Sequence, residues 1–229
     1  MKVFAHRGFS HNFPESTKIA YEKAVEVGAD GFECDVRLSR DNEIVCFHDA
    51  STKRISGKSR LVSFTDLSEL RNLVNVITLD ELLDIAIKAK KDLLIETKHP
   101  VIEGGRLEKK VLELLQRRGP EIERAGIEVI AMSFSLLAVL RLKRGYKNVA
   151  YVLAHRYRFL LLPTTKVAVK FDLFLNSAWV RRKLENHDVY LWTVNEIEQV
   201  ANVAKCNFAG LITDRPDLRY RFEELVVRE

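Results

Sequence analysis

Two histidines and three carboxylates stand at or near the ends of short apolar runs in this chain. The histidines are His6 and His48, and the carboxylates are Glu33, Asp35 and Glu96. An imidazole can take up or release a proton near neutral pH, and clustered carboxylate oxygens are ligands for hard divalent cations. This combination predicts a metal-assisted attack on a phosphodiester, with one histidine as general acid and the other as general base.

The spacing of the carboxylates predicts that they share a site. Glu33 and Asp35 are two positions apart, so on a strand both side chains point to the same face. Two carboxylates on one buried face repel each other unless a divalent cation, a lysine or a raised pKa relieves the repulsion. Glu96 could complete a site for Mg²⁺ or Ca²⁺, and Lys98 shares its face and could bind a phosphate oxygen. The alternative is a salt-bridged cluster with a purely structural role.

Residues beside the first histidine extend the candidate site. Arg7 could hold a phosphate through its forked guanidinium, and Gly8 would let the chain turn close to a ligand. Asp214 and Thr213, near the other end of the chain, are predicted to cap the last helix.

Aromatic residues follow two other apolar runs. Trp192 is either an indole of the core or an aromatic wall for the alcohol part of a substrate. Ser133 and Phe134 could line the same mouth.

Short runs rich in β-branched and aromatic residues alternate with amphipathic segments along the chain. The runs are Val3–His6, Gly31–Leu38, Leu93–Lys98, Glu128–Ser133, Asn148–Leu153, Phe171–Asn176, Val189–Val194 and Ala209–Asp214. The amphipathic segments are Glu15–Val27, Leu79–Lys90, Gly105–Arg118, Leu136–Arg144, Ala178–Asn186, Glu196–Lys205 and a last helix from Pro216. About eight repeats of strand and helix predict an α/β protein with the TIM (β/α)8 barrel fold, whose active site lies at the C-terminal ends of the strands.

One segment interrupts this alternation. Phe32–Ser39 and Ile44–His48 are separated by four residues, which is too short for a parallel crossover and favours a β-hairpin after the second strand. A turn centred on Asp41 and Asn42 would place His48 opposite Asp35. The following residues, 51–75, are expected to form a short excursion over the mouth of the barrel.

Length and composition favour one globular domain over residues 1–229, because no linker rich in Pro, Gly or Ser divides the chain. The net charge of +5 suits an anionic substrate, but the basic residues are scattered, so nucleic acid is not an expected partner. No run is long and apolar enough for a membrane span or resembles a signal peptide, so a cytoplasmic protein without a stable membrane anchor is expected. Homo-oligomer formation stays open. The three cysteines have no spacing typical of a disulfide framework or zinc site.

An ordered set of motifs resembles the glycerophosphodiester phosphodiesterase family. The motifs, in chain order, are HRG, PEST, GADGFECDVRLSRDNEIVCFHD, IETK, MSF, LWTVN and GLITDRPD. The resemblance covers most of the chain. It implies a TIM barrel that uses a divalent metal to hydrolyse small-molecule glycerophosphodiesters to glycerol 3-phosphate and an alcohol.

The same resemblance implies a role for each candidate residue. Glu33, Asp35 and Glu96 would be metal ligands, His6 and His48 acid and base, Arg7 and Lys98 phosphate-binding residues, and Trp192 a neighbour of the glycerol. The chain departs from the family at Ser16, where Asn is usual, which leaves the roles of Ser16 and Glu15 open. The excursion over residues 49–76 is also compact compared with many relatives.

Three other functions remain open. The first is lysophospholipase D-type hydrolysis of lysophospholipids at a membrane surface, with the apolar stretch Tyr157–Leu162 touching the membrane beside Arg156 and Arg158. The second is a phosphoinositide-type phospholipase, and the third is a catalytically silent barrel that binds anions or nucleic acid. Water and the substrate's own glycerol hydroxyl are both candidate nucleophiles.

Overall fold

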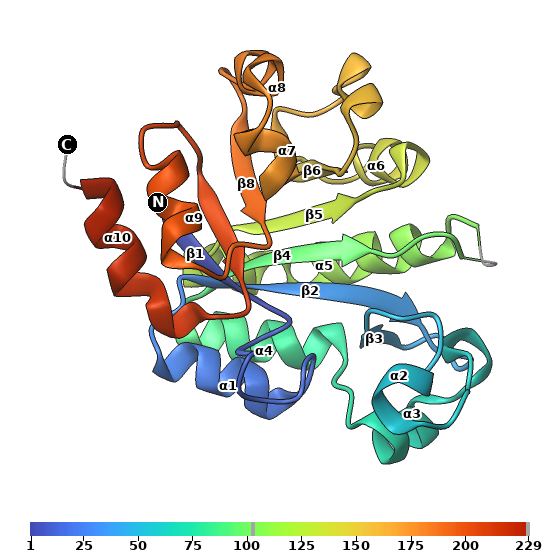
Figure 1. The fold of residues 1–229 in the computed structure, drawn as a ribbon. Helices are drawn as coiled ribbons and strands as arrows, with labels where there is room; N and C mark the ends of the chain where they lie inside the picture. Colours follow the sequence, from blue (N-terminus) through green and yellow to red (C-terminus); the bar gives the residue numbers. More distant parts are fainter. Residues whose placement is uncertain (102–103, 228–229) are drawn as a thin grey trace.

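The computed structural model describes residues 1–101 and 104–227, so residues 102–103 and 228–229 of the predicted single domain lie outside the described residues. Eight parallel strands form a closed barrel, because β1 pairs with both β2 and β9 (Figure 1). The strands are β1 Lys2–His6, β2 Gly31–Leu38, β3 Ile44–Cys46, β4 Asp92–Thr97, β5 Val129–Ser133, β6 Val149–Leu153, β7 Lys166–Lys170, β8 Asp188–Trp192 and β9 Gly210–Thr213. One further strand, β3, lies outside the barrel wall and runs antiparallel to β2. The predicted TIM barrel with a hairpin after its second strand is therefore confirmed.

Helices connect the strands and cover the outside of the barrel (Figure 1). They are α1 Lys18–Glu26, α2 Lys53–Ser56, η1 Val62–Phe64, α3 Leu67–Val74, α4 Leu79–Ala89, α5 Arg106–Ala125, α6 Leu136–Leu142, η2 Arg156–Leu160, α7 Phe171–Leu175, α8 Ala178–Lys183, α9 Ile197–Val203, η3 Pro216–Leu218 and α10 Arg219–Val227. Local sequence explains several boundaries: Thr78 and Glu81 form a capping box at the start of α4, and Gly126 ends α5 with a φ of 69°. No helix in the described part of the chain is long and apolar enough to cross a membrane.

The second strand shows how the barrel separates its two faces. Phe32 and Cys34 point outward into the hydrophobic layer beneath the helices, so the alternate residues Glu33 and Asp35 face the interior. Phe4 fills the interior of the barrel. It can do so because Gly31 lies against its ring, where a Cβ atom would come within 2.6 Å of the ring carbons.

The hairpin register differs by one residue from the prediction. Val36 pairs with Cys46 and Ser39 closes the turn through its bond to Glu43, which leaves a three-residue loop rather than a loop centred between Asp41 and Asn42. Asn42 adopts a left-handed conformation with φ of 66°, which is typical of three-residue hairpin loops. As a result, the backbone of Asp35 bonds to Phe47 rather than facing His48.

One predicted strand is wrong. Phe171–Asn176 forms mostly helix α7, and the seventh barrel strand, β7, comes earlier. Phe171 and Phe174 are three residues apart and both buried, which suits one face of a helix, whereas Val167 and Val169 alternate as in a strand. A short apolar run supports either structure, and the strand lies at Lys166–Lys170, between the runs predicted as strands.

The excursion after β3 has its own small hydrophobic cluster. Leu70 and Val74 of α3 pack with Val62 and Val76 against side chains of the hairpin. In Figure 1 α2 and α3 lie beside β3 and the C-terminal end of β2. This arrangement fixes the excursion next to the edge of the barrel where polar residues gather.

Candidate active site

Seven of the eight predicted site residues line one cavity of about 140 Å³ at the C-terminal ends of the strands. They are His6, Arg7, Glu33, His48, Glu96, Lys98 and Trp192. The eighth, Asp35, lies beside the cavity in contact with Arg7 and Lys98. The structure therefore brings the whole predicted set together.

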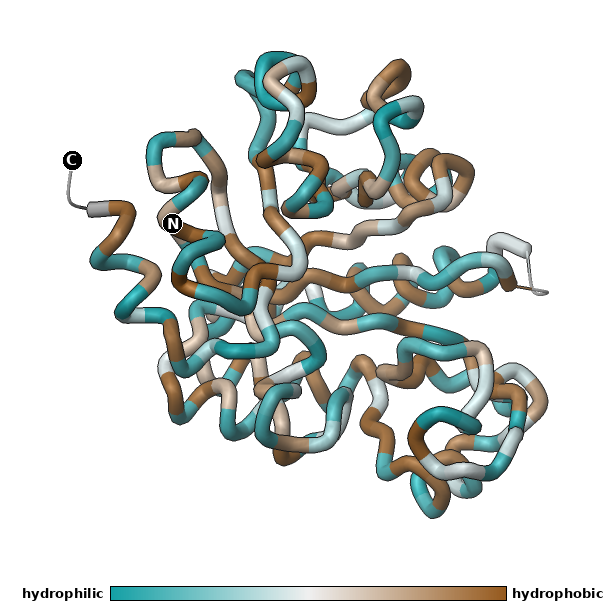
Figure 2. Tube along the Cα trace, viewed as in Figure 1, coloured by the Kyte–Doolittle hydropathy of each residue, from teal (hydrophilic) through white to brown (hydrophobic). Residues whose placement is uncertain are grey.

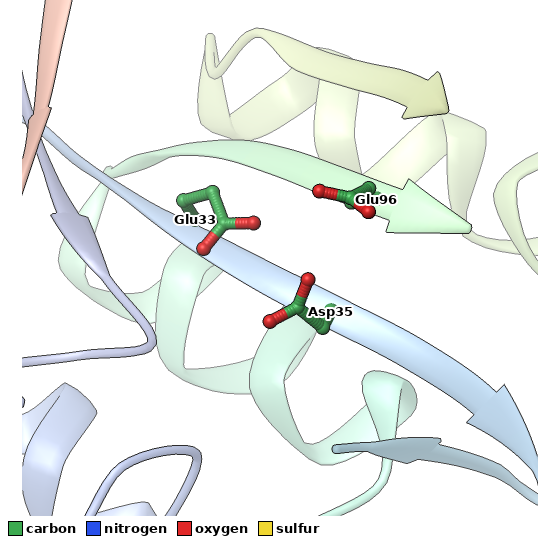
Figure 3. A group of neighbouring side chains, drawn as sticks. All are labelled: Glu33, Asp35 and Glu96. Atoms are coloured by element: carbon green, nitrogen blue, oxygen red, sulfur yellow. The ribbon is translucent and has the colours of Figure 1, made fainter. Parts of the chain in front are cut away.

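Strand register places the acidic residues side by side. Glu33 of β2 pairs with His6 of β1, and Asp35 pairs with Glu96 of β4. Figure 3 shows the three carboxylates pointing toward one another from these two strands. One oxygen of each lies within 4.8 Å of the others, and all three side chains are buried.

This cluster suits a hard divalent cation. Carboxylate oxygens are the preferred ligands of Mg²⁺ and Ca²⁺. Oε2 of Glu33 is buried and has no hydrogen-bond partner among the described residues, as expected of an atom that a cation would ligate. Such a cation would relieve the mutual repulsion of the carboxylates.

Burial and repulsion act directly on the acidic residues. Burial, and after it the charges of Asp35 and Glu96, raise the pKa of Glu33 well above its usual range. Burial and the charge of Asp35 likewise raise the pKa of Glu96 to about 7. Burial also acts to raise the pKa of Asp35, but the nearby Lys98 and Arg7 outweigh it and lower that pKa. The site thus holds one firmly ionised carboxylate and two that a cation would help to ionise.

Two cations lie against the cluster. Nζ of Lys98 is 2.7 Å from Oε1 of Glu96 and 3.0 Å from Oδ1 of Asp35. Nε of Arg7 is 2.7 Å from Oδ2 of Asp35, although this contact lacks the alignment of a hydrogen bond. Burial opposes the charge of Lys98, but Asp35 and Glu96 overcome it and raise the pKa of the ammonium group. Both cations are therefore charged and both line the cavity.

The turn after β1 packs closely against helix α1. Arg7 and Gly8 both have positive φ, at 56° and 84°. A Cβ atom at Gly8 would come within 2.7 Å of Ala20 in α1, so the close approach of a helix requires glycine here. This turn points Arg7 back toward β2.

His6 is held by a residue that the sequence analysis assigned to another role. Its Nδ1 lies 2.6 Å from Oδ1 of Asp214, and Nε2 lies 3.8 Å from Glu33. Asp214 also accepts hydrogen bonds from Ser10 and Asn195, so it does not cap the last helix as predicted. Burial acts to raise its pKa, but the hydrogen bond from His6 and those from Asn195 and Ser10 bring the pKa of Asp214 to about 2.

Replacement of Asp214 by asparagine should lower kcat by roughly 10- to 100-fold with a much smaller change in KM. The carboxylate accepts the Nδ1 proton and fixes the ring, whereas a carboxamide can present its NH₂ group and select the other tautomer. Steady-state kinetics on the purified variant measures both constants. An unchanged kcat would show that the contact does not position His6.

His48 has a similar arrangement at the end of the hairpin. Its Nδ1 lies 2.6 Å from Oδ1 of the adjacent Asp49, which the sequence analysis did not include in the site. Burial lowers the pKa of His48, and the positive charges of Lys98 and Arg7 lower it further, against the opposing effect of Asp35. The ring is therefore neutral over more of the pH range than an ordinary histidine, and its Nε2 is left to accept a proton.

The opposite wall of the cavity is apolar. Trp192 and Phe134 line it, with ring centroids 5.5 Å apart in an edge-to-face arrangement. Trp192 is therefore a wall residue rather than a core indole. Ser133 does not line the cavity, because its buried hydroxyl donates to the carbonyl of Thr97.

Ser16 and Glu15 support the site from behind Arg7. Ser16 has a φ of 60° and its N–H donates to the carbonyl of Arg7, while its buried hydroxyl has no hydrogen-bond partner among the described residues. Oε1 of Glu15 accepts from Nη1 of Arg7 at 3.1 Å and from Nη2 of Arg54 at 2.7 Å. Arg54, from α2, is another residue that the sequence analysis did not include.

Comparison with known proteins gives one family. The model described as "Glycerophosphoryl diester phosphodiesterase family" matches residues 6–218. The chain is 32% identical to the Mycobacterium tuberculosis protein named "Probable glycerophosphodiester phosphodiesterase 1", over 93% of this chain and 89% of that protein. It is 27% identical to a glycerophosphodiester phosphodiesterase of Bacillus altitudinis, over 97% of this chain and 98% of that one.

Solved structures show the same fold. The glycerophosphodiester phosphodiesterase of Thermotoga maritima superposes with a TM-score of 0.82 at 26% identity, covering 96% of this chain and 97% of that one. An Oleispira antarctica phosphodiesterase, crystallised with the product sn-glycerol-3-phosphate, superposes with a TM-score of 0.80 at 20% identity, covering 98% of this chain and 97% of that one.

Proposed function

The chain belongs to the glycerophosphoryl diester phosphodiesterase family and is an enzyme of that class, and we propose that residues 1–229 act as one catalytic domain that hydrolyses glycerophosphodiesters to glycerol 3-phosphate and an alcohol. One observation carries the proposal most strongly. Two histidines, two cations and two carboxylates line a single cavity, and the third carboxylate of the cluster, Asp35, lies beside it. Each histidine contacts a further carboxylate through Nδ1. This set matches the needs of phosphodiester hydrolysis, in which charge develops on phosphate oxygens and a proton must reach the leaving alcohol.

The carboxylates are the proposed metal ligands. Glu33, Asp35 and Glu96 would hold Mg²⁺ or Ca²⁺, and the ion would neutralise phosphate charge and orient the substrate. Lys98 and Arg7 would bind the phosphate oxygens beside it and counter the charge that grows in the transition state. The apolar wall of Trp192 and Phe134 would hold the glycerol carbons.

The two histidines divide the proton transfers. His48 has the lower-than-ordinary pKa of a neutral base and removes the proton from the nucleophile. His6, held through Nδ1 by Asp214, donates a proton to the leaving alkoxide through Nε2. The P–O bond to the alcohol breaks as the nucleophile bonds to phosphorus, and the net reaction consumes one water.

The proposed base predicts where activity is lost at low pH. His48 acts only when its ring is unprotonated, and because burial lowers the pKa of this ring from the ordinary 6.5, the acid-side decline of kcat/KM should have its midpoint below pH 6.5. The measurement is kcat/KM from pH 4.5 to 8 at saturating metal. A decline already centred above pH 6.5 would contradict the assignment of His48 as the base.

The direct test of the proposed function is the release of glycerol 3-phosphate from a glycerophosphodiester. Glycerophosphocholine and glycerophosphoethanolamine are suitable substrates, and an enzyme-coupled assay detects the product. A lack of product from both substrates with every divalent metal would reject the proposal.

A further inference from the structure

An open apolar groove of about 650 Å³ lies next to the catalytic cavity. Its outer wall carries Leu137 of α6 together with Tyr157, Leu160 and Leu161 in and after η2. These side chains are 63%, 66%, 80% and 57% exposed, in that order. In Figure 2 the outer end of the segment between β6 and β7 is brown, which marks it as hydrophobic. Such a concentration of exposed apolar side chains indicates a binding surface.

The groove and the catalytic cavity share one side chain. Phe134 lines both. Its ring lies 5.8 Å from Nζ of Lys98, which belongs to the proposed phosphate site, and packs against Trp192 on the cavity side. A molecule whose phosphate meets Lys98 therefore reaches the groove by passing over a single aromatic ring.

The charges around the groove suit an anionic amphiphile. Arg158 lines the groove, and its Nη1 donates to the carbonyl of Phe134, which holds η2 against the end of β5. Among the described residues that line the groove there is no Asp or Glu. The groove thus offers an apolar floor with positive charge beside it and no carboxylate to repel a phosphate.

We propose that this groove binds the acyl chain of a lysophospholipid whose phosphodiester occupies the catalytic cavity. The inference rests on the proposed function and names a substrate class for the same site. Water would supply the oxygen that bonds to phosphorus, the P–O bond to the headgroup alcohol would break, and the alcohol would leave with a proton. The products are the headgroup alcohol and a 1-acylglycerol 3-phosphate.

An acyl chain that belongs to the substrate fits the groove better than a separate partner molecule does. The glycerol carbons would contact Phe134 and Trp192, so an acyl group on the glycerol extends from the side of the cavity that the groove adjoins. Each methylene buried against apolar side chains strengthens binding by about 4-fold. The binding energy contributed by the acyl chain would raise kcat/KM without any change in the reacting groups.

The test compares soluble substrates that differ only in the acyl chain. Glycerophosphocholine, 1-hexanoyl-lysophosphatidylcholine and 1-octanoyl-lysophosphatidylcholine are assayed as monomers with the full-length protein. We expect kcat/KM to rise with the length of the acyl chain, by more than about 10-fold in total, because two buried methylenes already contribute about 16-fold, and the L160N/L161N variant to lose about 10-fold on the octanoyl substrate. The same variant should keep its rate on glycerophosphocholine. Leu61→Asn is the matched control, because Leu61 is also exposed, at 50%, but lies on the excursion.

The outcomes separate this inference from the proposed function. Hydrolysis of glycerophosphocholine without any dependence on chain length would overturn the groove assignment and leave the proposed function intact. Loss of all hydrolysis would reject the proposed function itself. Sedimentation with phosphatidylglycerol vesicles completes the test: if L160N/L161N weakens vesicle binding while chain length has no effect, the patch contacts membranes and does not hold an acyl chain.

A separate observation concerns Arg54 on the excursion. Its Nε lies 2.6 Å from Oδ2 of Asp49, and its Nη1 and Nη2 lie 2.8 and 2.7 Å from the two oxygens of Glu15. Asp49 contacts His48 at 2.6 Å, and Glu15 contacts Arg7 at 3.1 Å. One guanidinium therefore joins two carboxylates. Asp49 holds the proposed base, His48, and Glu15 holds Arg7, which is proposed to bind phosphate.

We infer that Arg54 is a positioning residue through which the excursion fixes His48 and Arg7. A guanidinium can bridge two carboxylates in fixed geometry, whereas lysine offers a single charged centre. Arg54 is 46% exposed and contacts neither the cavity nor the carboxylate cluster, so its effect must pass through Asp49 and Glu15.

Kinetics of Arg54→Ala, Asp49→Ala and the double variant test this inference. Arg54→Ala should lower kcat by about 10-fold, Arg54→Lys should restore part of it, and the double variant should lose less than the product of the two single losses, because only the route through Asp49 is shared. Arg60→Ala is the control, because Arg60 makes a comparable exposed ion pair, with Glu69, on the same excursion. Additive losses in the double variant, or an unchanged kcat in Arg54→Ala, would overturn the inference.

Discussion

Replacement of His48 or His6 by alanine should each lower kcat by about 100-fold or more. Each ring lines the catalytic cavity, and each is oriented through Nδ1 by a carboxylate, Asp49 or Asp214. Loss of His48 removes the proposed proton acceptor, and loss of His6 leaves the departing alkoxide without a proton donor. Both variants should bind the metal normally, since neither imidazole belongs to the carboxylate cluster.

The control for this pair is His187→Ala. His187 lies just before β8, at the end of the barrel opposite the cavity. The rate of the His187→Ala variant should match that of the unmodified protein. Steady-state kinetics with a glycerophosphodiester and a calorimetric titration with Mg²⁺ supply the two readouts. Near-normal rates in both active-site variants would refute their assignment as acid and base.

Replacement of Glu96 by glutamine should abolish most of the activity. It should also weaken metal binding by more than the roughly 10- to 100-fold that is lost when a residue that only orients a metal ligand is removed. The reason is chemical: the variant loses a carboxylate that lies within 4.8 Å of two others. Because the pKa of Glu96 is about 7, metal binding to the unmodified protein should also strengthen as pH rises toward that value. Titration calorimetry at pH 6 and pH 8 measures this dependence.

Asp92→Asn is the matched control for the carboxylate prediction. Asp92 lies on the same strand, β4, but at its other end, where it pairs with Lys2. Its metal affinity and rate should stay close to those of the unmodified protein. If Glu96→Gln bound Mg²⁺ as tightly as Asp92→Asn does, the cluster would not be the metal site.

The sequence allowed the barrel and the core of the site to be predicted because both depend on local patterns. Strand alternation puts Glu33 and Asp35 on one face whatever surrounds them, and the parallel register then brings Glu96 beside them. The same periodicity failed at Phe171–Asn176, where a short apolar run fits a helix as well as a strand.

The supporting residues could not be predicted because they depend on contacts between distant parts of the chain. Asp214 reaches His6 only because β9 pairs with β1 when the barrel closes. Arg54 reaches Glu15 only because the excursion packs against the hairpin, and its sequence has no motif of its own. Asp49 is adjacent to His48 in the sequence, so it was the one supporting residue with a detectable local signal.

The central claim is that this cavity hydrolyses glycerophosphodiesters with a divalent metal. The most direct measurement is the release of glycerol 3-phosphate from glycerophosphocholine, first after treatment with EDTA and then with Mg²⁺ or Ca²⁺ restored. We expect no release in EDTA and recovery with at least one of the two ions. Release that is equally fast in EDTA and with metal, or no release from any glycerophosphodiester or lysophospholipid under any of these conditions, would contradict it.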